Sequence, residues 1–436
     1  MPSSRLRVEG ALALIPDLEE LLPFTDALIG TSHPDAEKRW ARSGAYATLG
    51  MRVVDPARLA EMVPRLAERM RERTERLFAL VLDAVQQQEA GNPGGAAEVL
   101  VRAGEAEEEE RQLQKAEKFY SLALEIARDL RRKAPQILAL RRLGRVTRTA
   151  GRLDEAWGWY HQSYTLSVDQ MDLSGQIIAC QGLGNLCDDR GERVSAQEWY
   201  ERGLALAAGI DDPALTWPFY SNLSVLAMFR GDLAEADALL AQARSCFEAI
   251  GDPGLMFFWY NNRGLLRLES DAPAEAEEAY RDALGRGPDP FWEITIRGNL
   301  GQALLRQGRL FEAEEEARRA EEVAILHRYI PQLVDVYRLF GDISRERGDE
   351  EGFVFFEQAL EVCRERGLPP VHAAGVYHGY GLLLRACHRP AEALAYLDQA
   401  RAIYARLGLA RELSRVEADL PRVDADLPRV KEPAAV

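Results

Sequence analysis

The sequence predicts an all-α fold, an α-solenoid of about eight consecutive helix pairs. Its 436 residues are many for one compact domain, which favours several domains or a repeat array. A short pattern centred on a small residue recurs along most of the chain, and a pattern of Ala and aromatic residues follows each copy after a turn. Segments with Pro and Gly separate the copies, as expected where one helix ends before the next begins.

The first pattern repeats about every 40 residues. Copies such as "RRLGRV", "QGLGNL" and "NNRGLL" align on Gly144, Gly184 and Gly264. From Gly144 to Gly381 the aligned small residues lie 40, 40, 40, 37, 40 and 40 positions apart, and one further copy precedes them. A small residue at a fixed place in a helix lets a second helix cross closely, so each copy predicts one helix of a packed pair.

The second pattern predicts the other helix of each pair. Its clearest copy is "GRLDEAWGWYHQSY", with Gly151 in the turn and Ala156 and Tyr160 on the helix that follows. The Leu-Gly of the first helix and the Ala, Tyr and Ala of the second resemble the tetratricopeptide repeat (TPR). The spacing of 40 exceeds the usual unit of about 34 residues, as in the long-helix subgroup of kinesin light chains and bacterial signalling proteins. This resemblance implies a right-handed superhelix with the first helices on its concave side.

The repeat divides the chain into three expected parts. Residues 1–90 are an N-terminal helical region, expected to be a small bundle of one or two long amphipathic helices, with Pro64 as a possible break. Residues 91–409 form an array of about eight repeats, whose acidic segment "EAEEEERQ" is expected to be a solvated helical face. Residues 410–436 form a capping helix and a flexible tail containing "DLPRV" twice.

Composition argues against several functions. The net charge of −16 opposes nucleic-acid binding, which needs a surplus of Lys and Arg. The six His and five Cys form no HExxH or CxxC spacing, and no nucleotide or hydrolase signature is present. We therefore expect no enzyme, no metal and no cofactor. Apolar runs are shorter than the roughly 18 residues of a membrane span, so a cytoplasmic protein is expected, with its oligomeric state open. The predominance of Arg over Lys, with abundant Ala and Gly, is typical of a GC-rich genome and predicts a bacterial source.

Polar residues recur on one predicted face of the first helices. Asn222, Asn262 and Asn299 hold the same place in three consecutive units, and Asn261 is expected to face more squarely into the groove than Asn262. An amide offers a donor and an acceptor, so a ladder of amides can hold a peptide backbone, as in the similar long-helix TPR proteins. The candidate peptide-binding residues are Asn185, Asn222, Asn261, Asn262, Asn299, Gln302, Arg141, Arg145, Arg148, Arg338, Phe229 and Phe258.

Two alternatives stay open for this face. The amides can instead bridge neighbouring helices or tie down turns, and the arginines can form a salt-bridge face that offsets nearby acids. If the face binds a ligand, the chain is a protein-interaction scaffold that holds an extended, partly acidic peptide or disordered segment in the groove. The other functional hypothesis is a peptide-sensing regulatory receptor with the N-terminal region as its output, because the chain resembles quorum-sensing receptors of that design.

Overall fold

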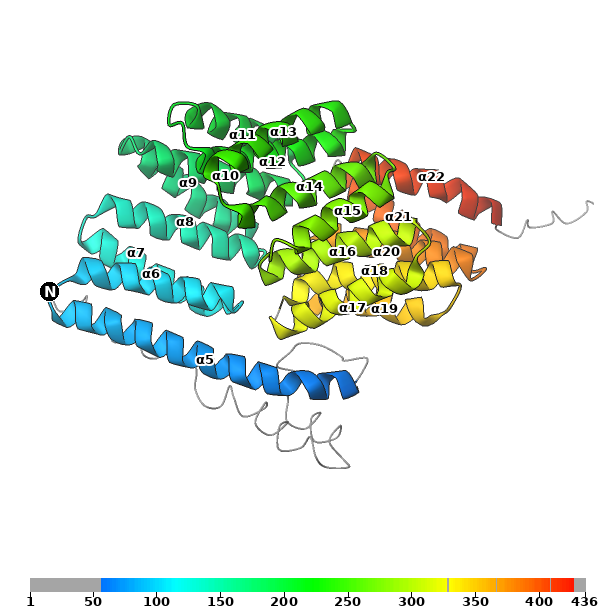
Figure 1. Cartoon of the computed structure of the whole chain (residues 1–436), viewed down its shortest axis with the longest axis horizontal. Coiled ribbons are helices and arrows are strands. Elements are labelled where there is room, and N and C mark those ends of the chain that lie inside the picture. The colour runs from blue at the N-terminus through cyan, green and yellow to red at the C-terminus, as the bar shows by residue number, and fades with distance from the viewer. Residues whose placement is uncertain (1–55, 328, 366, 408, 427–436) are drawn as a thin grey trace, which may run out of the picture. The chain divides into compact units, whose positions relative to one another are not determined.

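The described chain consists of consecutive helix pairs. The computed structural model describes residues 56–426 except 328, 366 and 408, and these residues contain helices and no strand (Figure 1). The long helix α5 (Pro56–Glu89) comes first, α22 (Ala410–Asp426) comes last, and the short 3-10 helices η3 (Pro253–Leu255) and η4 (Ile330–Gln332) precede two of the first helices. The pairs are α6 (Pro93–Glu109) with α7 (Leu113–Asp129), α8 (Lys133–Thr149) with α9 (Leu153–Asp169), α10 (Leu173–Asp189) with α11 (Arg193–Ala207), α12 (Pro213–Arg230) with α13 (Leu233–Ile250), α14 (Met256–Glu269) with α15 (Pro273–Leu284), α16 (Pro290–Arg306) with α17 (Leu310–Leu326), α18 (Leu333–Arg347) with α19 (Glu351–Glu365), and α20 (Pro370–Ala386) with α21 (Pro390–Arg406).

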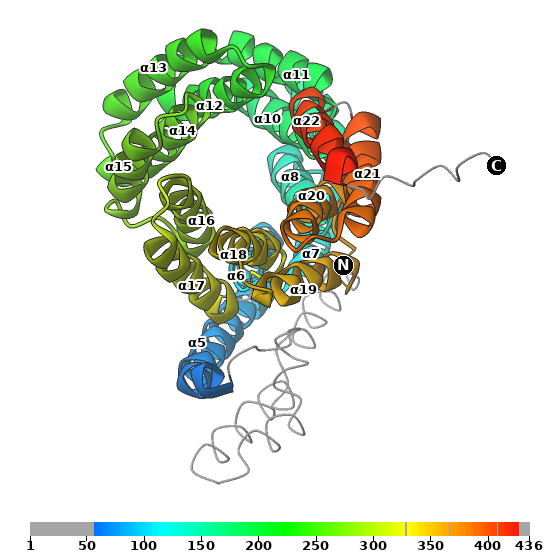
Figure 2. The same ribbon diagram turned by 90° about the vertical axis from the view of Figure 1, so that its right-hand side faces the viewer.

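The chain divides into two compact units. The first contains α5 to α11, the beginning of α12 and residues 325–329. The second contains the rest of α12, the helices from α13 to α22 apart from residues 325–329, and residues 189–192. In the second unit, α14, α16, α18 and α20 lie on the inner side of the curve, and α13, α15, α17 and α19 lie outside them (Figure 2).

Each aligned glycine of the repeat is covered by a ring or an aliphatic side chain. A Cβ atom added to Gly104 would lie 2.5 Å from Cε1 of Tyr120, and one added to Gly264 would lie 2.5 Å from Cε1 of Tyr280. Both tyrosines are fully buried in the second helices of their pairs. The predicted close crossing at the aligned glycines is therefore confirmed, because no larger side chain fits under these rings.

The turn inside each pair reverses the chain through a left-handed residue. Gly151 has φ of 78°, a conformation that glycine adopts without a steric penalty. The first pair has no glycine there, and Arg111 takes the same conformation with φ of 61°. The pair between α6 and α7 therefore forms although its turn lacks the usual residue.

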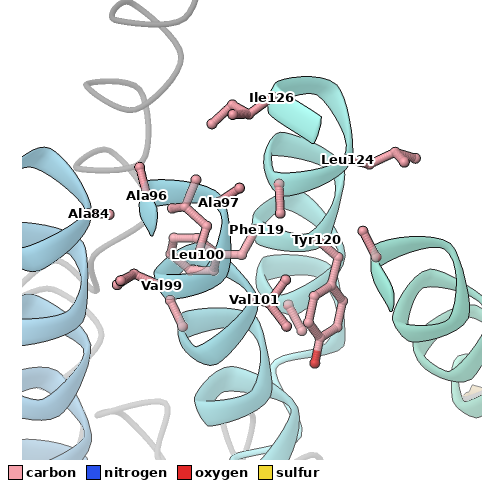
Figure 3. Packing of buried hydrophobic residues seen from close by; sticks show 14 of the residues in the cluster. Ala84, Ala96, Ala97, Val99, Leu100, Val101, Phe119, Tyr120, Leu124 and Ile126 are labelled. Atoms are coloured by element: carbon pink, nitrogen blue, oxygen red, sulfur yellow. The ribbon is translucent and has the colours of Figure 1, made fainter. Parts of the chain in front are cut away.

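Helix α5 covers the apolar side of the first pair. It continues unbroken from Pro56 to Glu89, so Pro64 does not split it. Leu77, Val81 and Ala84 of α5 are fully buried and belong to one core with residues of α6 and α7 (Figure 3). The remainder of the predicted N-terminal bundle, residues 1–55, lies outside the described residues.

The last helix is longer than the sequence indicates. Helix α22 runs to Asp426 and therefore includes the first copy of "DLPRV", residues 419–423, which contradicts the prediction of a flexible tail at this place. Val416 is fully buried, and Asp419 lies 2.9 Å from Nε2 of His378 on α20. These contacts hold the segment as a helix, and residues 427–436 lie outside the described part of the chain.

Candidate functional site

The acidic segment of α6 forms ion pairs on two sides. Glu107 is fully buried and accepts hydrogen bonds from Nε and Nη2 of Arg73 on α5, at 2.9 and 2.7 Å. On the other side, Glu108 accepts from Nη2 of Arg145 on α8 at 2.8 Å, and Glu105 pairs with Arg142. The prediction of a solvated acidic face is wrong, because α5 and α8 each bring arginines against it.

Arg145 forms an ion pair with Glu108 inside the array. The carboxylate of Glu108 also accepts a hydrogen bond of 2.7 Å from the hydroxyl of Tyr120. Burial lowers the pKa of Arg145, but the neighbouring Glu108 carboxylate outweighs it, so the pKa is raised overall. Burial, and then Glu108, raise the pKa of Tyr120 as well. For Arg145 the geometry supports the salt-bridge alternative.

Arg141 differs from its neighbours on α8. It is half-buried, and within the described residues it forms no hydrogen bond and no ion pair. Burial, and then the positive charges of Arg142 and Arg145, lower the pKa of its guanidinium group. Arg148 is also half-buried on this helix. Arg141 therefore stays a candidate contact for an anion.

Two further candidates have internal partners. Asn185 on α10 accepts a hydrogen bond of 2.8 Å from the hydroxyl of Tyr200, which ties the two helices of its pair together. Arg338 on α18 lies 3.4 Å from Asp335 and 3.9 Å from Asp342. Burial lowers the pKa of Arg338, but the two carboxylates outweigh it and raise the pKa overall. Asn185 therefore joins two helices, whereas the two carboxylates near Arg338 lie on its own helix.

Three asparagines on α14 and α16 form a chain of hydrogen bonds. Nδ2 of Asn299 donates to Oδ1 of Asn261 at 3.1 Å, and Nδ2 of Asn261 donates to Oδ1 of Asn262 at 3.2 Å. Asn261 is only 5% exposed and Asn262 is half-buried, so the prediction that Asn261 faces the groove more squarely than Asn262 is wrong. Asn299 of the neighbouring pair donates a hydrogen bond to the amide oxygen of Asn261 and so joins α16 to α14.

The ends of this amide chain keep unused hydrogen-bonding groups. Within the described residues, Nδ2 of Asn262 donates to no acceptor and Oδ1 of Asn299 accepts from no donor, although both residues are half-buried. Gln302, one turn after Asn299, has a buried Nε2 atom without a partner in the described chain. Two donors and one acceptor thus remain on adjoining helices.

Aromatic side chains lie on the same two helices. The ring of Phe258 stacks on Phe257 with centroids 4.1 Å apart and meets Trp292 edge to face at 4.9 Å. Asn222 and Phe229, the candidates on α12, are half-buried. The structure places Phe258 beside an aromatic neighbour from the next pair, an arrangement typical of apolar anchor sites.

The sequence interpretation missed two residues of this region. Trp292 comes from α16, and its contact with Phe258 depends on the way successive pairs stack. Gly298 stands in the interior of α16, directly before Asn299. A glycine inside a helix, at a place where the repeat does not require one, was the available signal.

Neither a metal cluster nor a membrane-spanning helix is found in the described chain. Within residues 56–426 and their stated gaps, no group of three or more His, Cys, Asp or Glu side chains is arranged to hold a metal ion. In the same residues, no helix combines the length and the apolar character needed to cross a membrane.

Comparisons with known proteins found structural likenesses alone. No family model and no curated protein matches the sequence. A Rap protein complexed with Competence and Sporulation Factor is 12% identical, with a TM-score of 0.38, over 96% of this chain and 98% of that one. A tetratricopeptide repeat protein from Parabacteroides merdae is 14% identical, with a TM-score of 0.34, over 74% of this chain and 98% of that one. A STAND signal-transduction ATPase with a tetratricopeptide repeat sensor, from Pyrococcus horikoshii, is 13% identical, with a TM-score of 0.45, over 92% of this chain and 72% of that one.

The type of repeat follows from the chain itself, through its helix pairs, its 40-residue period and the rings packed over the aligned glycines. The fold is of the tetratricopeptide type. The amide chain joins α14 and α16, which are the first helices of the fifth and sixth pairs of the array.

Proposed function

We propose that this TPR array is a protein-interaction scaffold that binds an extended polypeptide segment along α14 and α16 of the second unit. The observation that carries the proposal is the amide chain through Asn261, which orients the two outer amides. Asn262 then presents an N–H donor and Asn299 presents a carbonyl acceptor. A peptide group has the complementary pair, a C=O acceptor and an N–H donor.

Pairing through the main chain would make binding tolerant of ligand sequence. Hydrogen bonds to the backbone supply affinity, while side-chain pockets supply selectivity. Phe258 and Trp292 are the nearest candidates for an apolar anchor, because they form an edge-to-face pair on the same two helices. The expected ligand therefore has one large apolar side chain near a peptide group held by the amides.

The expectation of a partly acidic ligand now depends on Arg141. Arg145 and Arg142 already pair with Glu108 and Glu105, and Arg338 lies against Asp335 and Asp342. Arg141 lies in the first unit, so we propose it as a separate contact for a ligand carboxylate.

Selection from a random-sequence peptide display library tests this function. Peptides selected on the intact chain should lose at least tenfold in affinity for the double variant Asn262→Ala with Asn299→Ala. Gln399→Ala, which removes an exposed amide on α21, is the matched control and should bind unchanged. Equal affinity of a folded double variant, measured by calorimetry, would refute the proposal.

A further inference from the structure

Gly298 has no packing reason to be glycine. It lies in the interior of α16, where glycine is less favourable than alanine because its backbone loses more freedom on folding. At Gly264 and Gly301 an added Cβ would meet a neighbouring side chain, the ring of Tyr280 or the methyl of Leu339. At Gly298 nothing lies within 4 Å of an added Cβ. The described neighbours therefore do not account for this residue.

Gly298 lies close in sequence to residues whose hydrogen-bonding groups are unused in the described chain. It precedes Asn299 directly, and Gln302 follows it by four residues, on the same face of α16. A flat stretch of helix backbone is thus bordered by an acceptor, Oδ1 of Asn299, and by a buried donor, Nε2 of Gln302. Glycine is the residue that lets another backbone approach a helix most closely.

We infer that the main chain of a bound polypeptide passes over Gly298 in van der Waals contact, an inference that rests on the proposed function. A ligand N–H donates there to Oδ1 of Asn299, and a ligand carbonyl accepts from Nδ2 of Asn262. The ligand residue above Gly298 points its own side chain away from α16. Gly298 therefore selects an extended backbone and excludes a helical ligand, whose side chains would hold its backbone off the surface.

A matched pair of alanine substitutions tests the inference. Gly158 also lies in a helix interior, on α9, with nothing within 4 Å of an added Cβ. Gly298→Ala and Gly158→Ala should both raise the Tm, because alanine is the better helix former. Only Gly298→Ala should weaken binding of the library-selected peptides, by about tenfold or more, because its methyl group holds the ligand backbone away. Unchanged affinity of Gly298→Ala would overturn the inference.

The Asn262→Ala, Asn299→Ala double variant separates this inference from the proposed function. If the double variant loses binding and Gly298→Ala does not, the contact at Gly298 is wrong and the proposed function stands. If no peptide is selected, or the double variant binds normally, both fail.

N-methylation of the selected peptide gives a second measurement on the unaltered protein. Methylation of one backbone nitrogen, the one above Gly298, should cost tenfold or more in affinity, because it removes the donor to Asn299 and adds bulk at the contact. Tolerance of N-methylation at every position would overturn the inference.

Discussion

Two regions of the array hold predicted ligand-binding residues, and they satisfy their polar groups differently. Along α6 and α8, arginines and glutamates pair with each other, as in Arg145 with Glu108. Along α14 and α16, three amides bond in sequence through the buried Asn261. An ion pair neutralises both partners, whereas each amide carries a donor and an acceptor, so an amide chain always ends with one unused group of each kind. A polar residue on a first helix is therefore available to a ligand only when its neighbours leave one of its hydrogen-bonding groups unused.

The largest expected effect comes from breaking the buried ion pair of the first region. Glu107→Leu removes the buried carboxylate that accepts two hydrogen bonds from Arg73. The side chains of Glu107 and Arg73 are 0% and 4% exposed. We expect a loss of about 3–5 kcal/mol in the free energy of unfolding, measured by urea denaturation. Glu109→Leu, which breaks the exposed pair with Arg76, is the control and should cost less than about 1 kcal/mol. Equal losses would show that burial does not distinguish the two pairs.

Salt should distinguish the two regions. Arg145→Gln removes a charged hydrogen bond to Glu108 and should cost about 1.5–3 kcal/mol at low ionic strength. Because the side chain of Arg145 is 42% exposed, this cost should shrink in about 1 M NaCl, where the Debye length is about 3 Å. Asn261→Leu removes two neutral hydrogen bonds, and its cost should not change with salt. If salt changes the stability cost of both substitutions equally, the contrast between an ionic first region and a neutral second region is wrong.

The smallest effect is expected at Arg141. Arg141→Gln removes a guanidinium that has no hydrogen bond in the described chain. Burial and the charge of Arg142 both lower the pKa of this group. The free energy of unfolding should change by less than about 0.5 kcal/mol, because no hydrogen bond or ion pair of the described chain is lost, or rise slightly because a like-charge contact is relieved. A loss above about 1.5 kcal/mol would mean that Arg141 has a structural role like that of Arg145.

The local patterns of the sequence were sufficient for the helix pairs. Gly104 and Tyr120, or Gly264 and Tyr280, meet as expected, because a small residue and a ring on adjacent helices have one close way to pack. The same reasoning failed at Asn261 and in the acidic segment of α6. Exposure there depends on which side chains the neighbouring pairs supply, and the period of a single helix contains no information on that.

The sequence by itself determined the repeat, its period and the choice of amides and arginines for the first helices, because these depend on residues close together in the chain. Only the tertiary structure decided that Asn299 covers Asn261, that Glu107 is buried against Arg73, and that the space beside Gly298 stays open. The first two features depend on contacts between residues 38 and 34 positions apart, where the orientation of each side chain is set by the packing of its neighbours.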